Sequence, residues 1–451
     1  MPLALVGALC AIQVCLLKYH LTRLNLLTAV YGFVLTAMVV LCELLQMFSE
    51  NLRFEACLSN ALFTERLNAL ASSTLVAASC LYHGCALFWA DREKWVPRDN
   101  ETAVRDFARE TALPTLILGG LLLIATCYGT LITEQPYASD RSLEQTAMLS
   151  SAGTMLLSMY LIVMALVFTI RGEGYESRST IVVAILGLAL VIVFRSLRGD
   201  RGGGSIYLVS LMALFLIYSK RPTRQKYLWL SAMVLAVLIF FQSMAFTRHH
   251  AAEYGLLGGF AEGFQRNCVD VVFGPNGFDP SGIQLLPQGY WHLLNTIDLY
   301  DQGVSLNGSS FYNLIPQMLP DSFAQWIGYE RPLNISWRLA EYRNHSGGMF
   351  LIAEGYWNLG LAGALLVTLA LARAATAYES WVRRQDAVLL GAYLGLLGLF
   401  SVGMFYGLQS MVRGWEINIA LAILLKYMMR HRQRGPGKLA GMSKQTCRSA
   451  S

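Results

Sequence analysis

The stretch 348–372 reads GMFLIAEGYWNLGLAGALLVTLALA, and Glu354 is its one charged residue. A helix of this length would extend for about 37 Å, more than the roughly 30 Å of a bilayer's hydrocarbon core. An acid inside such a helix is expected to face the interior of a bundle, because facing lipid would leave its charge unpaired. The stretch therefore predicts a transmembrane helix with a buried, partnered carboxylate.

Apolar runs of the same kind recur along the whole chain of 451 residues. Hydrophobic residues make up 55% of it and charged residues 14%, against roughly 45–50% and 25% in soluble domains. This balance excludes a soluble enzyme and a disordered chain, and it indicates no nucleic-acid partner. We predict an all-α, polytopic integral membrane protein with about eleven transmembrane helices. The expected spans are 2–17, 24–48, 68–90, 112–132, 147–170, 180–194, 205–219, 227–247, 348–372, 387–407 and 412–428.

The distribution of lysine and arginine predicts the orientation. The alternate connections that include 18–23 and the tail hold 23 of these residues, whereas the other set holds 12 although it contains the longest connection. All seven lysines fall in the first set. Because cytoplasmic connections carry the excess of positive charge, the N-terminus is expected outside and the C-terminus inside. No basic region precedes the first span, so we expect that span to be retained.

The one large polar segment is 248–347, which we call the cap segment. Its Gly and Pro turns and dispersed aromatic residues predict a folded cap outside the membrane. It separates the first eight spans (1–247) from the last three (348–430), and a basic tail (431–451) follows. Asp298 and Asp301 are expected on a solvated helix face. The sequence predicts no metal site and no cofactor. We give His249, His250 and His292 less weight than the histidine discussed below.

Three arginines and four glycines meet in the link between the sixth and seventh spans, which reads RSLRGDRGGG over 195–204. Both flanking spans are short, so the link is expected at or below the level of the lipid headgroups, where uncompensated charges are costly. Asp200 alone cannot neutralise Arg195, Arg198 and Arg201. A glycine-rich turn that enters a helix offers N–H groups to an anion, and arginine adds a forked donor. This pattern predicts a diphosphate site; the alternative is a tight turn whose arginines reach lipid headgroups.

The end of the cap segment brings more polar residues to the mouth of the ninth span. Arg338 and Arg343 precede His345, which lies beside two glycines where that span begins, and Glu354 follows. A histidine near a diphosphate and an acceptor hydroxyl can serve as a general base. A lone histidine at a helix start is more often structural, so both interpretations stay open.

Together these features resemble the Wzy-type polysaccharide polymerases, a family of bacterial inner-membrane proteins. The resemblance is carried by the turn 199–202, the cap segment, and three short motifs: FYNLIP at 311–316 with Arg331-Pro332, NHSG at 344–347, and Glu354-Gly355-Tyr356 followed by Asn358 and Gly360. It covers about a third of the chain. The first 180 residues match only as a hydrophobic bundle.

The resemblance implies a metal-independent glycosyltransferase that joins undecaprenyl-diphosphate-linked oligosaccharide repeat units at the periplasmic face. Arg195, Arg198, Arg201, Arg338 and Arg343 would bind diphosphate. His345, Arg201 and Glu354 would be catalytic, while Tyr356 and Asn358 would contact substrate. The expected partners are lipid-linked glycans, membrane lipid and a protein that regulates chain length. Asp200 departs from the turn of some polymerases, which leaves open how many arginines bind phosphate.

Two alternatives remain. An O-antigen ligase shares this layout and differs in its acceptor. A lipid-linked oligosaccharide flippase or other transporter belongs to a different class, and it predicts charges along a central cavity that opens to both sides. The enzyme predicts that the arginines and His345 gather at the outer face under the cap segment.

Overall fold

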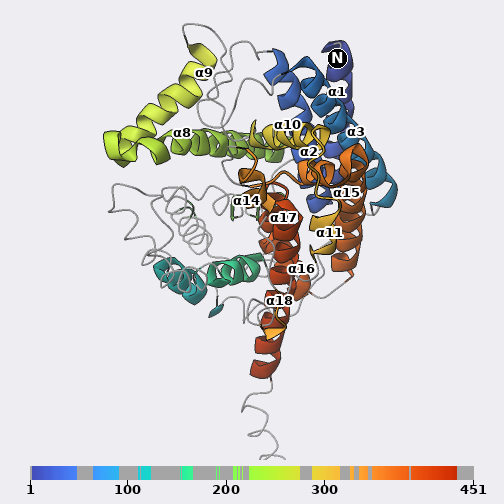
Figure 1. Ribbon diagram of the computed structural model, residues 1–451. Coiled ribbons are helices and arrows are strands. Elements are labelled where there is room, and N and C mark those ends of the chain that lie inside the picture. The colour runs from blue at the N-terminus through green and yellow to red at the C-terminus, as the bar shows by residue number, and fades with distance from the viewer. Residues whose placement is uncertain are drawn as a thin grey trace, which may run out of the picture.

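The computed structural model describes residues 3–47, 64–90, 110–111, 113–122, 153, 155–165, 189, 192, 207–210, 212–213, 216, 223–274, 287–314, 326–329, 335–343, 348–384 and 387–433. These residues are mostly helical, as predicted (Figure 1). Within them the only strand-like pairing is a single parallel bridge between Met349 and Tyr406.

Three apolar helices from the N-terminal region pack side by side: α1 (Leu3–Thr22), α2 (Leu26–Met47) and α3 (Glu65–Trp89). The start of α3 follows from its sequence, because the Thr64 side chain accepts a hydrogen bond from the Leu67 N–H at 3.3 Å. Such a cap satisfies one of the N–H groups that a helix leaves unpaired at its start. These helices fall on the first three predicted spans, although α1 continues through most of the connection expected at 18–23.

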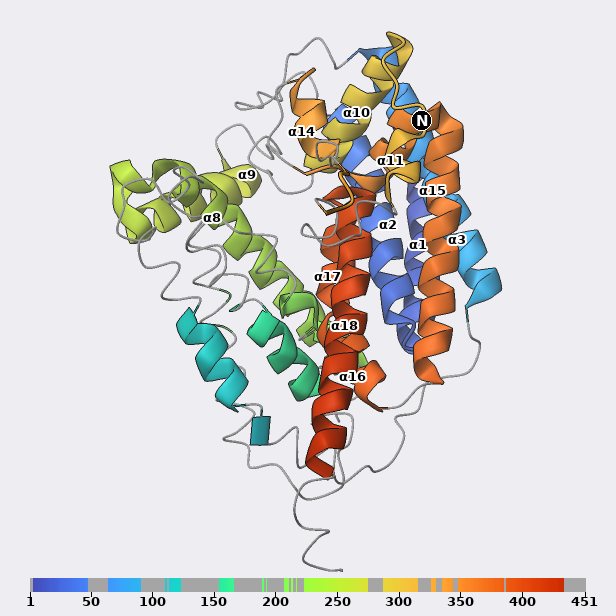
Figure 2. The same ribbon diagram turned by 60° about the horizontal axis from the view of Figure 1, so that its bottom comes forward.

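Helices from the second half of the chain complete the bundle. α15 (Leu351–Arg383) packs against α3 and α2, while α16 (Ala387–Gly395) and α17 (Leu397–Gly403) pack against α18 (Gly407–Gln433). The tenth predicted span is therefore divided between α16 and α17. The short helices α11 (Ser309–Tyr312) and α14 (Ile335–Ala340) lie with α10 (Pro287–Asp301) at one end of the bundle (Figure 2).

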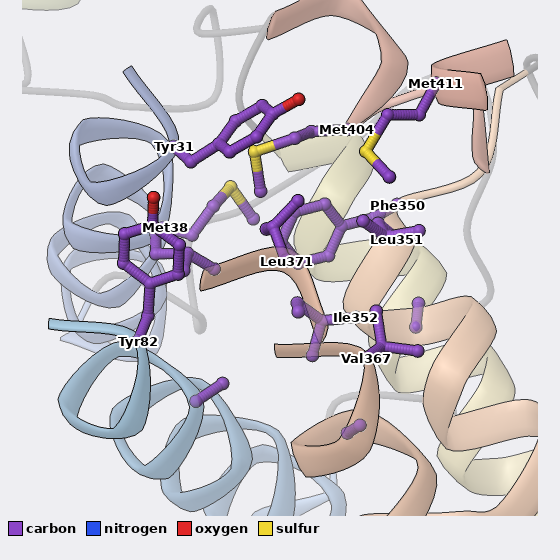
Figure 3. Packing of buried hydrophobic residues seen from close by; sticks show 14 of the residues in the cluster. Tyr31, Met38, Tyr82, Phe350, Leu351, Ile352, Val367, Leu371, Met404 and Met411 are labelled. Atoms are coloured by element: carbon purple, nitrogen blue, oxygen red, sulfur yellow. The ribbon is translucent and has the colours of Figure 1, made fainter. Parts of the chain in front are cut away.

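α10 belongs to the cap segment, yet it packs against α15, α3 and α2. Its apolar side chains Leu293, Leu294 and Ile297 are fully buried. They join a core to which α2, α3, α15, α17 and α18 all contribute, and in which Tyr31, Met38, Tyr82, Phe350 and Met404 point toward one another (Figure 3). Part of the cap segment is thus an integral layer of the bundle.

The ninth predicted span is not one continuous helix, which corrects the expectation for 348–372. α15 is broken at Leu359 and Gly360, where Gly360 has φ +62° and ψ −150°. A Cβ atom added to Gly363 would lie 2.0 Å from the Gly355 carbonyl oxygen. Two glycines therefore let residues 351–358 fold back closely onto 361–383, because neither carries a side chain at the crossing. The longer part would extend for about 34 Å.

α8 (Thr223–Phe264) also departs from the predicted boundaries, since it runs through the expected end of the eighth span. It bends at Gly255, which has φ +67°. Beyond the bend, a Cβ atom on Gly263 would lie 2.3 Å from the Ser243 carbonyl oxygen. Residues 256–264 of the cap segment are thus the returning arm of a helical hairpin, which continues into the π-helix η3 (Gln265–Val269) and α9 (Asp270–Phe273).

Two helices among the described residues, α3 and α15, are long and apolar enough to cross a membrane. Shorter apolar helices occupy Leu26–Val40, Leu113–Leu122 and Met155–Ala165. Several helices also expose large apolar side chains, among them Phe33, Phe88, Leu118, Leu235, Leu366 and Ile423. Water does not favour such surfaces, whereas lipid does.

Candidate functional site

Glu354 lies at the end of the bundle where α10, α11 and α14 gather, on the short part of α15 before its break. Its side chain is 2% exposed, and its Oε2 accepts a hydrogen bond of 2.7 Å from the Leu408 N–H. Leu408 is in the first turn of α18, so the carboxylate lies at the positive end of that helix's dipole. The prediction that Glu354 faces a partner inside the bundle is confirmed. We call its surroundings the Glu354 corner, formed by Ser310, Glu354, Asn358 and Leu408.

Asn358 occupies the turn of α15 that follows Glu354 and is 1% exposed. Its Nδ2 donates to the Ser310 Oγ at 2.7 Å and to the Glu354 carbonyl oxygen at 2.8 Å. Ser310 is also hydrogen-bonded to the Glu354 carboxylate. The Asn358 Oδ1 atom has no hydrogen-bond partner in the part of the chain that the structure describes. The corner therefore keeps one buried acceptor for which a donor such as a hydroxyl is suited.

Two tyrosines meet at the break in α15. The rings of Tyr300 and Tyr356 lie edge to face, with their centroids 5.7 Å apart. A Cβ atom on Gly360 would lie 3.0 Å from the Tyr300 ring, so the glycine leaves room for that ring as well as adopting the turn. Tyr356, which the sequence predicted to contact substrate, is 7% exposed, whereas Tyr300 is 37% exposed.

Arg343, just after α14, forms an ion pair with Asp298 of α10. The Arg343 Nη2 donates to the Asp298 Oδ2, and the side chains are 28% and 23% exposed. One turn further along α10, Asp301 pairs with Arg66 of α3 at 2.9 Å. The expectation of a solvated helix face is confirmed for Asp301, which is exposed beside a largely exposed Arg66, whereas Asp298 is mostly covered and pairs with Arg343. Arg338 is half-buried on α14.

His292 has a larger structural role than the sequence indicated. It is 3% exposed, and its Nδ1 accepts a 3.0 Å hydrogen bond from the Phe350 N–H at the start of α15. The neighbouring Met349 and Leu351 N–H groups donate to carbonyl oxygens of Phe405 and Met404, each at 2.8 Å. These bonds fix the entry of α15 against α10 and α17. Only its position in the apolar helical pattern around Trp291 and Leu294 could have indicated that His292 is buried.

The structure thus brings Glu354, Tyr356 and Asn358 onto the short part of α15 and pairs Arg343 with Asp298 of α10, the helix that also carries Tyr300. Arg195, Arg198, Arg201 and His345 lie outside the described residues. The predicted approach of the arginine-rich turn to the start of the ninth span lies outside them as well. Sequence reasoning did not find Ser310, which has no motif around it beyond a Gly-Ser-Ser turn.

Within the described ranges, no three His, Cys, Asp or Glu side chains come together as metal ligands would. No family model, curated protein or solved structure matches the chain. The assignment of function therefore rests on the residues and their geometry.

Proposed function

We propose that this protein is an integral membrane glycosyltransferase of the polysaccharide polymerase type. It joins undecaprenyl-diphosphate-linked oligosaccharide repeat units at the periplasmic face of the bacterial inner membrane. The observation that carries the proposal is the convergence of separate sequence motifs at one end of an apolar bundle. Arg343 comes from the end of the cap segment, and Glu354, Tyr356 and Asn358 come from the broken helix α15.

The proposed membrane arrangement has eleven spans, with the N-terminus outside and the C-terminus inside. It is supported by the apolar side chains exposed along α15, including Leu361, Leu366 and Leu369, which recur at the spacing of one helix face. The guanidinium of Arg373 lies 5.6 Å from the ring centroid of Trp89, and such a pair suits a membrane boundary. In this arrangement the Glu354 corner faces the periplasm.

The proposed reaction transfers the growing glycan from its lipid diphosphate to the incoming repeat unit. An acceptor hydroxyl oxygen bonds to the anomeric carbon, the bond from that carbon to the diphosphate oxygen breaks, and undecaprenyl diphosphate leaves with the electron pair. His345 accepts the hydroxyl proton. Arginines compensate the charge that develops on the diphosphate, a form of electrostatic catalysis that requires no metal. Asn358 and Tyr356 orient the acceptor sugar.

Reconstitution with defined substrates tests this function. Purified protein is mixed with undecaprenyl-diphosphate repeat units in the presence of EDTA, and the products are separated on a gel beside those of His345→Ala and Arg201→Ala. We expect a ladder with the native chain and none with either variant at equal protein levels. Arg201→Lys should recover only part of the ladder, because a point charge replaces a fork. Full activity of Arg201→Gln would remove the phosphate role.

The acceptor separates the two enzyme classes in the same experiment. An O-antigen ligase would leave repeat units unjoined and would transfer glycan when lipid A core is added. Without transfer to either acceptor, movement of the substrate across the bilayer of a proteoliposome would indicate a flippase.

A flippase is favoured by one specific feature, a polar seam between α1, α2 and α3. Gln13, His20, Ser79 and His83 are buried there, and each has a side-chain nitrogen or oxygen without a hydrogen-bond partner among the described residues. The His83 Nε2 lies 3.1 Å from the Thr36 Oγ1. Buried polar groups inside apolar helices are typical of transport pathways. Loss of transport in a His83→Phe variant would support this second function.

A further inference from the structure

The ion pair between Arg343 and Asp298 occupies a position of functional interest. Asp298 lies in the last turn of α10, and its Oδ2 accepts hydrogen bonds from the Arg343 Nη2 and, at 2.9 Å, from the Gln302 Nε2. Both charged side chains are about three-quarters buried. Salt screens such a partly buried pair less than it screens a fully exposed one.

The backbone around Arg343 is fixed without the ion pair. The Arg343 N–H donates to the Leu339 carbonyl oxygen at 3.0 Å, which continues the turn of α14. The Tyr342 ring packs edge to face against Trp357 of α15, with centroids 6.2 Å apart. A change of partner by Arg343 therefore requires movement of its side chain alone.

A guanidinium binds a carboxylate and a phosphate through the same planar fork of N–H donors. On the basis of the proposed function, we propose that Asp298 is a positioning residue that holds the Arg343 guanidinium in the substrate-free protein and releases it to the diphosphate of the lipid-linked substrate. In the substrate-free protein, the Asp298 carboxylate accepts the hydrogen bond that a phosphate oxygen accepts when substrate is bound. When the diphosphate product leaves, Arg343 returns to Asp298, so the acid lowers affinity for the anion and favours release of product.

Binding of inorganic pyrophosphate to the purified full-length protein tests this role. The probe is titrated in detergent, with binding followed by calorimetry. We expect Asp298→Asn to bind pyrophosphate about fivefold more tightly, because the competing carboxylate is removed, and this corresponds to about 1 kcal/mol. Asp301→Asn is the matched control: it lies on the same helix one turn away and its carboxylate pairs with Arg66, so it should bind like the native chain.

The double variant Asp298→Asn, Arg343→Gln should lose the whole gain. A merely structural role for Asp298 would weaken binding or leave it unchanged, and neither change would depend on Arg343. The role is overturned if Asp298→Asn binds no more tightly than Asp301→Asn, if the gain survives Arg343→Gln, or if no variant binds pyrophosphate. Should Asp298→Asn fail to give folded protein, Asp298→Ser serves in its place.

The titration involves no glycan transfer, so its outcome is separate from that of the reconstitution. A gain in pyrophosphate binding without a ladder would leave the positioning role intact and remove the polymerase function. A ladder with unchanged binding by Asp298→Asn would do the reverse.

Discussion

Two buried glutamates of α15, Glu354 and Glu379, each accept a hydrogen bond from the first turn of a neighbouring helix, but they differ in the other donors that reach the carboxylate. At the Glu354 corner, the donor is the Leu408 N–H in the first turn of α18. At the second corner, which we call the Glu379 corner, the carboxylate accepts a hydrogen bond of 2.6 Å from the Leu27 N–H in the first turn of α2. Each carboxylate therefore fixes the start of a neighbouring helix, where the helix dipole favours negative charge.

Both oxygens of the Glu379 carboxylate accept hydrogen bonds. The Thr28 and Tyr393 hydroxyls donate to the carboxylate at 2.6 and 2.7 Å, in addition to the Leu27 N–H. On the next turn of α15, Arg383 donates to the Asn25 side chain and, at 3.3 Å, to the Leu24 carbonyl oxygen, so the connection from α1 to α2 is held as well. At the Glu354 corner, the Asn358 Oδ1 atom has no hydrogen-bond partner among the described residues. Both corners thus contain a buried amide atom without a described partner, Asn25 Nδ2 in one and Asn358 Oδ1 in the other, and they differ in the donors that reach the carboxylate. In the proposed function, the Glu379 corner stabilises the fold and the Glu354 corner also contacts substrate.

The largest expected effect is the loss of stability on removing Glu379. Glu379→Ala leaves the Thr28 and Tyr393 hydroxyls without their acceptor, whereas the Leu27 N–H keeps the Tyr393 oxygen at 3.1 Å. Each buried donor left without an acceptor costs about 1–3 kcal/mol. We expect the free energy of unfolding to fall by about 3 kcal/mol in total. Denaturant unfolding of the purified protein measures it. An unchanged unfolding midpoint would show that the network contributes nothing, and the contrast between the corners would disappear.

The sequence predicted one corner better than the other, for a physical reason. Glu354 stands alone in an apolar run, so its burial follows from the cost of exposing charge to lipid. Glu379 lies among polar residues near Arg383 and Arg384, in a stretch expected to be a connection. Its partners Leu27 and Tyr393 are distant in the chain, and no local pattern links them to it.

The break in α15 could not be predicted from the sequence either. Gly355, Gly360 and Gly363 are ordinary residues in membrane helices, and only the close approach of 351–358 to 361–383 shows why they are glycines. The positions of α1, α2 and α3, by contrast, follow closely from the apolar runs. The ion pairs of Asp298 and Asp301 could not be predicted, because both guanidiniums come from elements that are remote in sequence.

The next largest effect is a loss of activity when Glu354 is replaced by glutamine, which keeps the shape of the side chain and removes its charge. Glu354→Gln can still accept the Leu408 N–H through its amide oxygen but loses the negative charge, so we expect chain extension to fall about thirtyfold, equivalent to about 2 kcal/mol of transition-state stabilisation. The unfolding midpoint should change little. Initial rates of ladder formation, normalised to folded protein, provide the measurement.

Glu379→Gln is the matched control for that experiment. It should lower the unfolding midpoint while leaving the normalised rate within about twofold of the native chain, because Glu379 is outside the proposed substrate site. Equal loss of rate in the two glutamine variants would contradict separate roles for the corners.

A smaller effect is expected from Gly360→Ala, which perturbs the Glu354 corner through the backbone. Gly360 has φ +62° and ψ −150°, a conformation that costs a residue with a side chain about 1–3 kcal/mol. The new methyl group would also press on the Tyr300 ring. We expect a lower unfolding midpoint together with severalfold slower chain extension. Gly84→Ala, in α3 with open space around it, is the control and should be neutral or slightly stabilising.

The smallest expected effect is a change in KM on replacing Asn358, and a second buried asparagine, Asn418, provides the control. Asn418 uses both ends of its amide: its Oδ1 accepts from the Tyr378 hydroxyl at 2.6 Å and its Nδ2 donates to the Ala392 carbonyl oxygen at 2.6 Å. Asn358 leaves its Oδ1 without a partner among the described residues. Asn358→Ala should therefore raise the KM for the repeat unit about fivefold, or about 1 kcal/mol, because the lost acceptor served the substrate. Asn418→Ala should leave the KM unchanged. It should lower the unfolding midpoint more than Asn358→Ala does, because it leaves the Tyr378 hydroxyl without its acceptor. If the two variants changed KM alike, the Asn358 Oδ1 atom would have no part in substrate binding. The Glu354 corner would then stabilise the fold in the way that the Glu379 corner does.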